Sequence, residues 1–168
     1  MFLDESGVTT EMTRRYGWAA RPERVSEAVP AGHWRILTVL AALTTQGVLA
    51  SMTIESPTDG DIVLAFLEQV LAPNLQPGHV VILDNLGAHK VPEVRPLIES
   101  RGAQLLYLPP YSPDFNPIEL AWSKLKQQLR GVKARVIDQL EVAITEALAA
   151  ITAENARAFF RHCGYGIQ

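Results

Sequence analysis

The sequence lacks the features that mark several large classes of protein. Cys163 is the single cysteine, which excludes an internal disulfide and a cysteine-based zinc site and is typical of a reducing cytosol. No two histidines have the H-x-x-x-H spacing of a zinc-binding helix. The longest mainly apolar run, Ile36–Leu43, is far shorter than the ~20 residues of a membrane span. Because Asp4 and Glu5 follow Met1 in place of a basic signal-peptide segment, we expect a cytoplasmic protein without a membrane segment.

The composition is otherwise ordinary for a folded protein. The 168 residues are 48% hydrophobic and 20% charged, and they include 11 glycines and 11 prolines. These proportions exclude collagen-like, disordered and coiled-coil chains. A domain commonly takes ~100–200 residues, and the sequence contains neither an internal repeat nor a linker-like segment. We therefore expect residues 1–168 to form one domain.

The net charge of −3 is unevenly distributed along the chain. Residues 120–137 contain basic side chains and no acidic one, so this stretch carries +5 and leaves the remainder at −8 within the total. Its basic residues are Lys124, Lys126, Arg130, Lys133 and Arg135. A smaller basic group near the start comprises Arg14, Arg15, Arg21 and Arg24. Such stretches fit a nucleic-acid surface and an ordinary solvated helix face equally well, so charge alone does not decide the function.

Hydrophobic periodicity and turn residues predict a series of strands and helices. The expected strands cover residues 1–3, 34–44, 48–54, 80–83 and 104–108. Five helices are expected. The first is opened by residues 56–59 and stopped by Pro73, and the second covers 92–100. The third runs from Asn116-Pro117 to a break at Gly131, the fourth covers 137–151, and the fifth runs from a cap at Thr152 to Phe160. Asp4-Glu5-Ser6-Gly7 is expected to turn, and residues 8–31 to form a loop or irregular hairpin. This order indicates an α/β fold with a mixed sheet and helices on its faces.

Two aspartates follow apolar strands of this prediction. Asp4 follows the first apolar segment, and Asp84 follows Val80–Leu83, at the strand edge where open α/β sheets bind ligands. Glu119 lies in the first turn of a helix, after a proline-rich loop. Three carboxylates brought together would repel one another, and Mg²⁺ or Mn²⁺, which prefer oxygen ligands, would relieve the repulsion. Two such ions can activate a water or hydroxyl and stabilise the leaving oxygen in phosphodiester cleavage.

Each acid also has a simpler structural interpretation. Asp4 and Asp84 belong to a residue type that favours turns. Glu119 is three residues after Asn116, where it could complete a capping box. The occurrence of two strand-end aspartates and a helix-start glutamate in this order favours a shared site.

Three stretches of the sequence resemble the motifs of a known family. They are Phe2-Leu3-Asp4-Glu5-Ser6, then Ile82-Leu83-Asp84-Asn85 followed by His89, and then Leu108-Pro109-Pro110-Tyr111-Ser112-Pro113-Asp114-Phe115-Asn116-Pro117-Ile118-Glu119 with Trp122. Between Asp84 and Glu119 lie 34 residues, and the chain closes with His162-Cys163-Gly164-Tyr165. Over essentially its whole length it resembles the bacterial insertion-sequence branch of the mariner-type transposases, which belong to the Asp-Asp-Glu (DDE) group. The resemblance implies a ribonuclease-H-like, integrase-like α/β fold with a mixed five-stranded sheet and helices on both faces.

The resemblance also implies an activity. Asp4, Asp84 and Glu119 would be the catalytic triad and would bind two ions of Mg²⁺ or Mn²⁺. Such enzymes bind the inverted-repeat ends of a DNA element, hydrolyse phosphodiester bonds to free 3′-hydroxyls, and join these to target DNA, commonly at TA. Family members act as dimers or larger assemblies, so the resemblance implies a homodimer, acting on the DNA of the nucleoid.

The chain departs from the family at its start. Members normally carry helix-turn-helix DNA-binding modules before the first aspartate, whereas only three residues precede Asp4. This predicts either the downstream product of a split gene, with a separately encoded helix-turn-helix segment, or a truncated relic. A catalytically inactive remnant that only binds DNA or dimerises is therefore the alternative function. A phosphatase of the haloacid dehalogenase type is disfavoured, because it would need a second aspartate at the position of Ser6.

Basic residues near the acids are candidates for DNA contacts. These are His89, Lys90, Lys124, Lys126 and Arg130. Lys126 lies seven residues after Glu119 and so on nearly the same helix face, where we expect it to contact a phosphate; a solvent-facing lysine is the alternative. His89 and its neighbour could face DNA or form an ordinary surface turn. Trp122 is expected in the core, on the apolar stripe of its helix.

Overall fold

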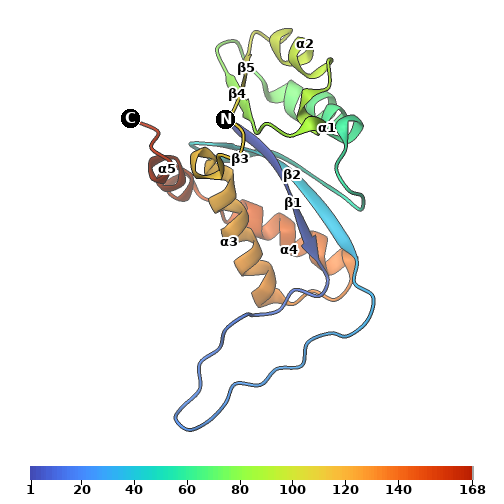
Figure 1. Ribbon diagram of the computed structural model, residues 1–168, viewed down its shortest axis with the longest axis vertical. Coiled ribbons are helices and arrows are strands. Elements are labelled where there is room, and N and C mark those ends of the chain that lie inside the picture. The colour runs from blue at the N-terminus through green and yellow to red at the C-terminus, as the bar shows by residue number, and fades with distance from the viewer. Residues whose placement is uncertain (168) are drawn as a thin grey trace.

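The computed structural model describes residues 1–167, and a five-stranded mixed sheet lies at its centre (Figure 1). The strands are β1 (Phe2–Thr9), β2 (Ile36–Thr44), β3 (Gly47–Ile54), β4 (Val80–Leu83) and β5 (Gln104–Tyr107). Their order in the sheet is β3-β2-β1-β4-β5. The first three strands form an antiparallel group, whereas β4 pairs in parallel with β1 and with β5. The predicted mixed sheet is confirmed.

Helices cover both faces of the sheet (Figure 1). One face carries α1 (Gly60–Phe66), which continues into a wider turn over Leu67–Leu71, and α2 (Val94–Glu99). The other face carries α3 (Pro117–Val132), α4 (Ile137–Ala149) and α5 (Ala153–His162). Within residues 1–167, no helix is long and apolar enough to cross a membrane.

The side chains of β2 show why the sheet is buried on both faces. Leu37 and Val39 pack into the core beneath α3, α4 and α5, whereas Leu40 and Ala42 pack into the core beneath α1 and α2. Because successive side chains of a strand point to opposite faces, one apolar run supplies both cores. Trp122 lies in the core, as predicted, with 2% of its surface exposed.

The first strand is longer than the sequence predicts. β1 does not turn after Leu3 but continues through Asp4-Glu5-Ser6-Gly7 to Thr9, because β2 pairs with it from its first residue to its last. The backbone pairing with an apolar partner strand outweighs the turn preference of these residues. The pairing of β1 with β4, in contrast, covers only Phe2 and Leu3 of β1. Asp4 therefore lies inside a strand, at the point where the pairing with the parallel neighbour ends.

Two further boundaries differ from the prediction. The loop covers residues 10–35 instead of the expected 8–31 and extends away from the sheet (Figure 1), and β2 begins at Ile36 instead of Trp34. α3 passes through Gly131 and ends at Val132, and Lys133, with a φ of 58°, caps it. A glycine inside a helix costs only about 1 kcal/mol relative to alanine, so the packing of α3 against the sheet outweighs it.

Candidate active site

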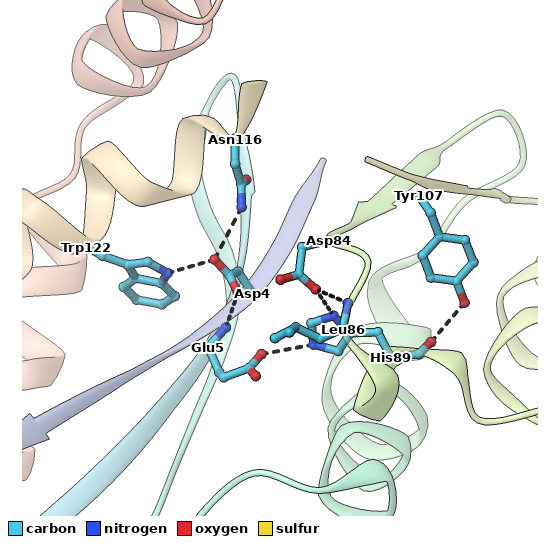
Figure 2. Close-up of polar contacts among 8 residues, drawn as sticks. All are labelled: Asp4, Glu5, Asp84, Leu86, His89, Tyr107, Asn116 and Trp122. Carbon is cyan, nitrogen blue, oxygen red and sulfur yellow. Dashed lines mark hydrogen bonds and ion pairs between the residues drawn. The ribbon is translucent and has the colours of Figure 1, made fainter. Parts of the chain in front are cut away.

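Asp4 is a buried carboxylate held by three donors. Only 5% of the residue is exposed. Its Oδ1 accepts a hydrogen bond from the backbone N–H of Glu5 at 2.8 Å. Its Oδ2 accepts from Asn116 Nδ2 at 3.2 Å and from Trp122 Nε1 at 3.4 Å (Figure 2). The start of α3 is thus joined to β1 through this carboxylate.

The electrostatics of Asp4 show that other acids lie near it. Burial is the main reason why the pKa of Asp4 rises from 3.8 to about 7. The backbone hydrogen bond from Glu5 opposes the rise, and the negative charges of Glu5, Glu119 and Asp84 add to it. The structure therefore brings the three predicted acids into one region, from β1, from the end of β4 and from the start of α3.

Asp84 directly follows β4 and is held through one oxygen. Its Oδ1 accepts the backbone N–H of Leu86 at 3.0 Å and lies 2.5 Å from Nδ1 of His89. Burial alone would raise the pKa of Asp84, but the hydrogen bonds from His89 and Leu86 outweigh it and hold this pKa below its ordinary value. Asp84 is consequently ionised at neutral pH.

His89 lies between two carboxylates and is fully buried. Its Nδ1 faces Asp84, and its Nε2 lies 2.9 Å from Oε2 of Glu5 (Figure 2). Burial lowers the pKa of His89, but the hydrogen bonds to Asp84 and Glu5 and their negative charges outweigh burial and raise it to about 10. The imidazole is therefore protonated at neutral pH and donates from both nitrogens.

A groove of about 380 Å³ runs beside these residues. Asp84, Glu119 and the proline-rich loop Pro109–Pro113 line it, and Asn116 lies at its wall. The side chain of Asn116 does not cap α3, because its amide donates to Asp4 instead. The capping-box interpretation of Glu119 is therefore wrong, and its exposed carboxylate is free to act in the groove.

The donor set fits a hard divalent cation. The groove and its surroundings offer carboxylate oxygens, and Oδ1 of Asn116 is buried without a hydrogen-bond partner within the described residues. Oxygen ligands of this kind suit Mg²⁺ and Mn²⁺. Among residues 1–167 no three His, Cys, Asp or Glu side chains are gathered tightly enough to form a metal site as they stand.

The predicted basic residues lie in different environments. Lys126 is half-buried on α3; burial lowers its pKa, and the opposing influence of Glu119 and Asp4 shows that it lies near these acids. Lys90 is exposed at the groove beside Asp84. The ammonium of Lys124 donates to the carbonyl of Ala150 at 3.0 Å and to the Asn155 side chain, so it joins α3 to the start of α5.

Arg130 lines a second groove, of about 810 Å³, between α3 and the 10–35 loop. Arg14, Arg15 and Lys124 contribute to the same groove, and no acidic side chain is among its lining residues. Burial lowers the pKa of Arg130, and the positive charge of Arg15 lowers it further. Arg15 and Arg130 therefore lie near each other in a basic groove.

Sequence reasoning placed His89 wrongly. Its side chain is neither on a surface turn nor able to face DNA, because it is fully buried and both ring nitrogens are engaged. The roles of Glu5, Asn116 and Trp122 beside the acids were missed. A signal existed for Trp122, because a buried indole N–H needs an acceptor. A signal for Glu5 required the full length of β1: in a strand that continues past Leu3, the side chains of Asp4 and Glu5 point to opposite faces of the sheet.

The sheet order and the helices on both faces are those of the ribonuclease-H-like fold, which the Mos1 transposase and the BIV integrase core share. The chain belongs to the DDE superfamily endonuclease family, whose model matches residues 1–141.

Relatives agree with this assignment. The chain is 38% identical over 65 residues to the transposable element Tc1 transposase of Caenorhabditis elegans. These matched residues make up 39% of the chain and 24% of the Tc1 protein. The Mos1 transposase paired-end complex with left transposon end matches 96% of the chain and 51% of its own, with 16% identity and a TM-score of 0.72. The catalytic core domain of BIV integrase matches 79% of the chain and 91% of its own, with 18% identity and a TM-score of 0.51. The chain thus spans a quarter to a half of these transposases.

Proposed function

We propose that this chain is the catalytic domain of a metal-dependent DNA transposase of the bacterial insertion-sequence branch of the mariner superfamily. The proposal is supported by Asp84 and Glu119, which line one groove, and by Asp4, which lies close enough to both for their charges to raise its pKa, in a chain that belongs to the DDE endonuclease family. In this function the domain hydrolyses phosphodiester bonds at the ends of a DNA element and joins the freed 3′-hydroxyls to target DNA.

The three acids would hold Mg²⁺ or Mn²⁺, two ions in the full complex. When bound, such ions activate the attacking water or 3′-hydroxyl and stabilise the leaving oxygen. Mos1 paired-end complexes with Mn and with Mg, matched at TM-scores of 0.66 and 0.67, support divalent metal use by proteins of this fold. Glu119 is already exposed to the groove, and Asp84 is already ionised. Asp4 is the acid that must lose its proton, because its pKa is about 7.

Basic residues on two sides of the acids would bind the DNA backbone. Lys126 lies close to Glu119 and Asp4, where it can contact a phosphate next to the reacting bond. Lys90 would contact the strand in the groove that Asp84 and Glu119 line. Arg130 and Arg15, whose like charges lie near each other in the second groove, would each gain from a phosphate bound beside them.

The partners in this function are the inverted-repeat ends, the target DNA and a second copy of the chain. Sequence-specific binding to the ends would come from a helix-turn-helix segment, which the described residues do not contain. The Mos1 transposase that shares this fold forms a paired-end complex with its left transposon end, and this supports assembly on two DNA ends.

Nicking of a supercoiled plasmid in Mn²⁺ tests the proposal. The wild-type chain is expected to nick the plasmid, whereas Asp84→Asn and Glu119→Gln are expected to reduce nicking to background. Asp138→Asn, which alters an exposed carboxylate on α4, is the matched control and is expected to nick at the wild-type rate. Equal nicking by the wild type and Asp84→Asn would assign the activity to a contaminant and overturn the proposal.

An inactive remnant that binds DNA or dimerises is the second candidate. It is favoured by the engagement of both oxygens of Asp4 with protein donors and by the lack of a ready three-residue metal group in residues 1–167. The remnant predicts salt-dependent DNA binding without any Mn²⁺-dependent nicking. The same plasmid assay, run beside a DNA-binding titration, separates the two candidates.

A further inference from the structure

His89 is enclosed by groups from three separate elements. Its Nδ1 lies 2.5 Å from Asp84 Oδ1, which follows β4, and its Nε2 lies 2.9 Å from Glu5 Oε2 on β1. Its backbone carbonyl accepts a hydrogen bond from the hydroxyl of Tyr107, on β5, at 2.8 Å. Both the ring and the backbone of His89 are therefore fixed relative to the sheet.

These contacts leave the two oxygens of Asp84 in different states. Oδ1 receives the N–H of Leu86 and the ring of His89, whereas Oδ2 has no hydrogen-bond donor among residues 1–167. Asp84 stands just beyond β4, and 30% of its side chain is exposed. A carboxylate at the rim of a groove needs such an anchor to keep one orientation.

We propose that His89 is a positioning residue that, supported by Glu5, fixes Oδ1 of Asp84 and thereby presents Oδ2 to a divalent cation. The inference rests on the proposed function, because it takes Asp84 as a metal ligand. Groups that orient a metal ligand from behind commonly change metal affinity by about 10–100-fold when they are removed.

Stability alone does not account for this arrangement. A buried ion pair gains little over well-packed apolar residues, because the charges must first be desolvated. The enclosed imidazole between two acids is therefore better explained by the orientation that it gives to Asp84 than by a contribution to folding.

Two substitutions separate the two ring nitrogens. His89→Asn places an amide nitrogen near the position of Nδ1 and retains the contact with Asp84. His89→Gln places an amide nitrogen near the position of Nε2 and retains the contact with Glu5 only. Both variants remove the ring and one of its two hydrogen bonds, so they serve as controls for each other in thermal unfolding.

The measurement is Mn²⁺ affinity of the 168-residue chain, from the electron paramagnetic resonance signal of free Mn²⁺. We expect His89→Asn to bind within about threefold of the wild type and His89→Gln to bind about 10–100-fold more weakly. Equal Mn²⁺ affinity of the two variants would overturn the inference, whether both match the wild type or both fall in parallel with their unfolding temperatures.

Glu5 gives a second test from the other end of the contact. Glu5→Ala removes the support of Nε2 and leaves the contact of Nδ1 with Asp84, as His89→Asn does, so it is expected to weaken Mn²⁺ binding by at most about threefold, whereas Glu5→Gln retains an acceptor and is expected to match the wild type. A loss of Mn²⁺ affinity in Glu5→Ala as large as that expected for His89→Gln would contradict the inference.

Asp84→Asn distinguishes this inference from the proposed function. If Asp84→Asn loses Mn²⁺ binding while His89→Gln keeps it, the positioning role fails and the metal site stands. If Asp84→Asn binds Mn²⁺ like the wild type, the proposed metal site fails, and the positioning role fails with it.

Discussion

Replacing Asp4 by asparagine is expected to stabilise the metal-free protein in alkaline solution and to leave it nearly unchanged in acid. Burial raises the pKa of this carboxyl from 3.8 to about 7 in the folded protein. Between these two pH values the folded state binds more protons at this site than the unfolded state does. The free energy of unfolding therefore falls as pH rises from about 4 to about 7, and the loss is complete above pH 7.

The two pKa values of Asp4 differ by about three pH units, and each unit corresponds to 1.36 kcal/mol. Keeping this carboxylate ionised in the folded state at pH 8 thus costs about 4 kcal/mol as an upper bound. Asparagine has the same shape without the charge, and both it and the protonated carboxyl accept fewer hydrogen bonds than the carboxylate, so this loss is common to the two neutral forms. Asp4→Asn should therefore be more stable than the wild type by at most about 4 kcal/mol at pH 8. Near pH 4 the protonated carboxyl resembles the amide, and the two proteins should agree within about 1 kcal/mol.

Urea unfolding in EDTA, followed by tryptophan fluorescence at pH 4, 6 and 8, measures this difference. Asp138→Asn, at an exposed position on α4, is the control and should keep the wild-type profile. If Asp4→Asn lowers the free energy of unfolding by the same amount at every pH, the reasoning that a buried, charge-crowded carboxyl governs this pH dependence is refuted.

Three further outcomes are expected. At pH 8, Mn²⁺ at 100 times its Kd should raise the free energy of unfolding by about 2.7 kcal/mol in the wild type and not in Asp84→Asn, as measured in urea; equal effects would rule out binding at Asp84. Lys126→Ala should weaken DNA binding and reduce the slope of log K against log salt by about 0.9, and an unchanged slope would exclude a phosphate contact. Leu125→Ala, at a fully buried core position, should destabilise the chain by about 2–5 kcal/mol in urea.

The parts of the fold that could be predicted depend on local pattern. β4 is a short unbroken apolar run, and the start of α3 carries proline at its first turn, so both appear in the sequence without knowledge of distant partners. β1 could not be predicted in this way. Asp4-Glu5-Ser6-Gly7 has the composition of a turn, and only pairing with β2, some 35 residues away, holds it as a strand.

The predictability of the site also depends on whether its features are local in the sequence. Asp84 and Glu119 could be found from motif and spacing, because each lies next to a predicted element. The hydrogen bonds of Asp4 to Asn116 and Trp122 join residues that are 112 and 118 positions apart. No periodicity in one sequence encodes such a contact, so the surroundings of the first acid became visible only in the folded chain.

The unexpected length of β1 is what unites the site. The side chains of Phe2 and Val8 pack under α3, α4 and α5, whereas Leu3 packs under α1 and α2. By the alternation of a strand, Asp4 must face α3 and Glu5 must face the opposite side, where His89 lies. Two consecutive acids thus tie the start of α3 and the segment after β4 to the same strand. A chain that turned after Leu3, as its composition suggests, would lose both connections. Asp84 after β4 and Glu119 on α3 would then not be held in place by the same strand.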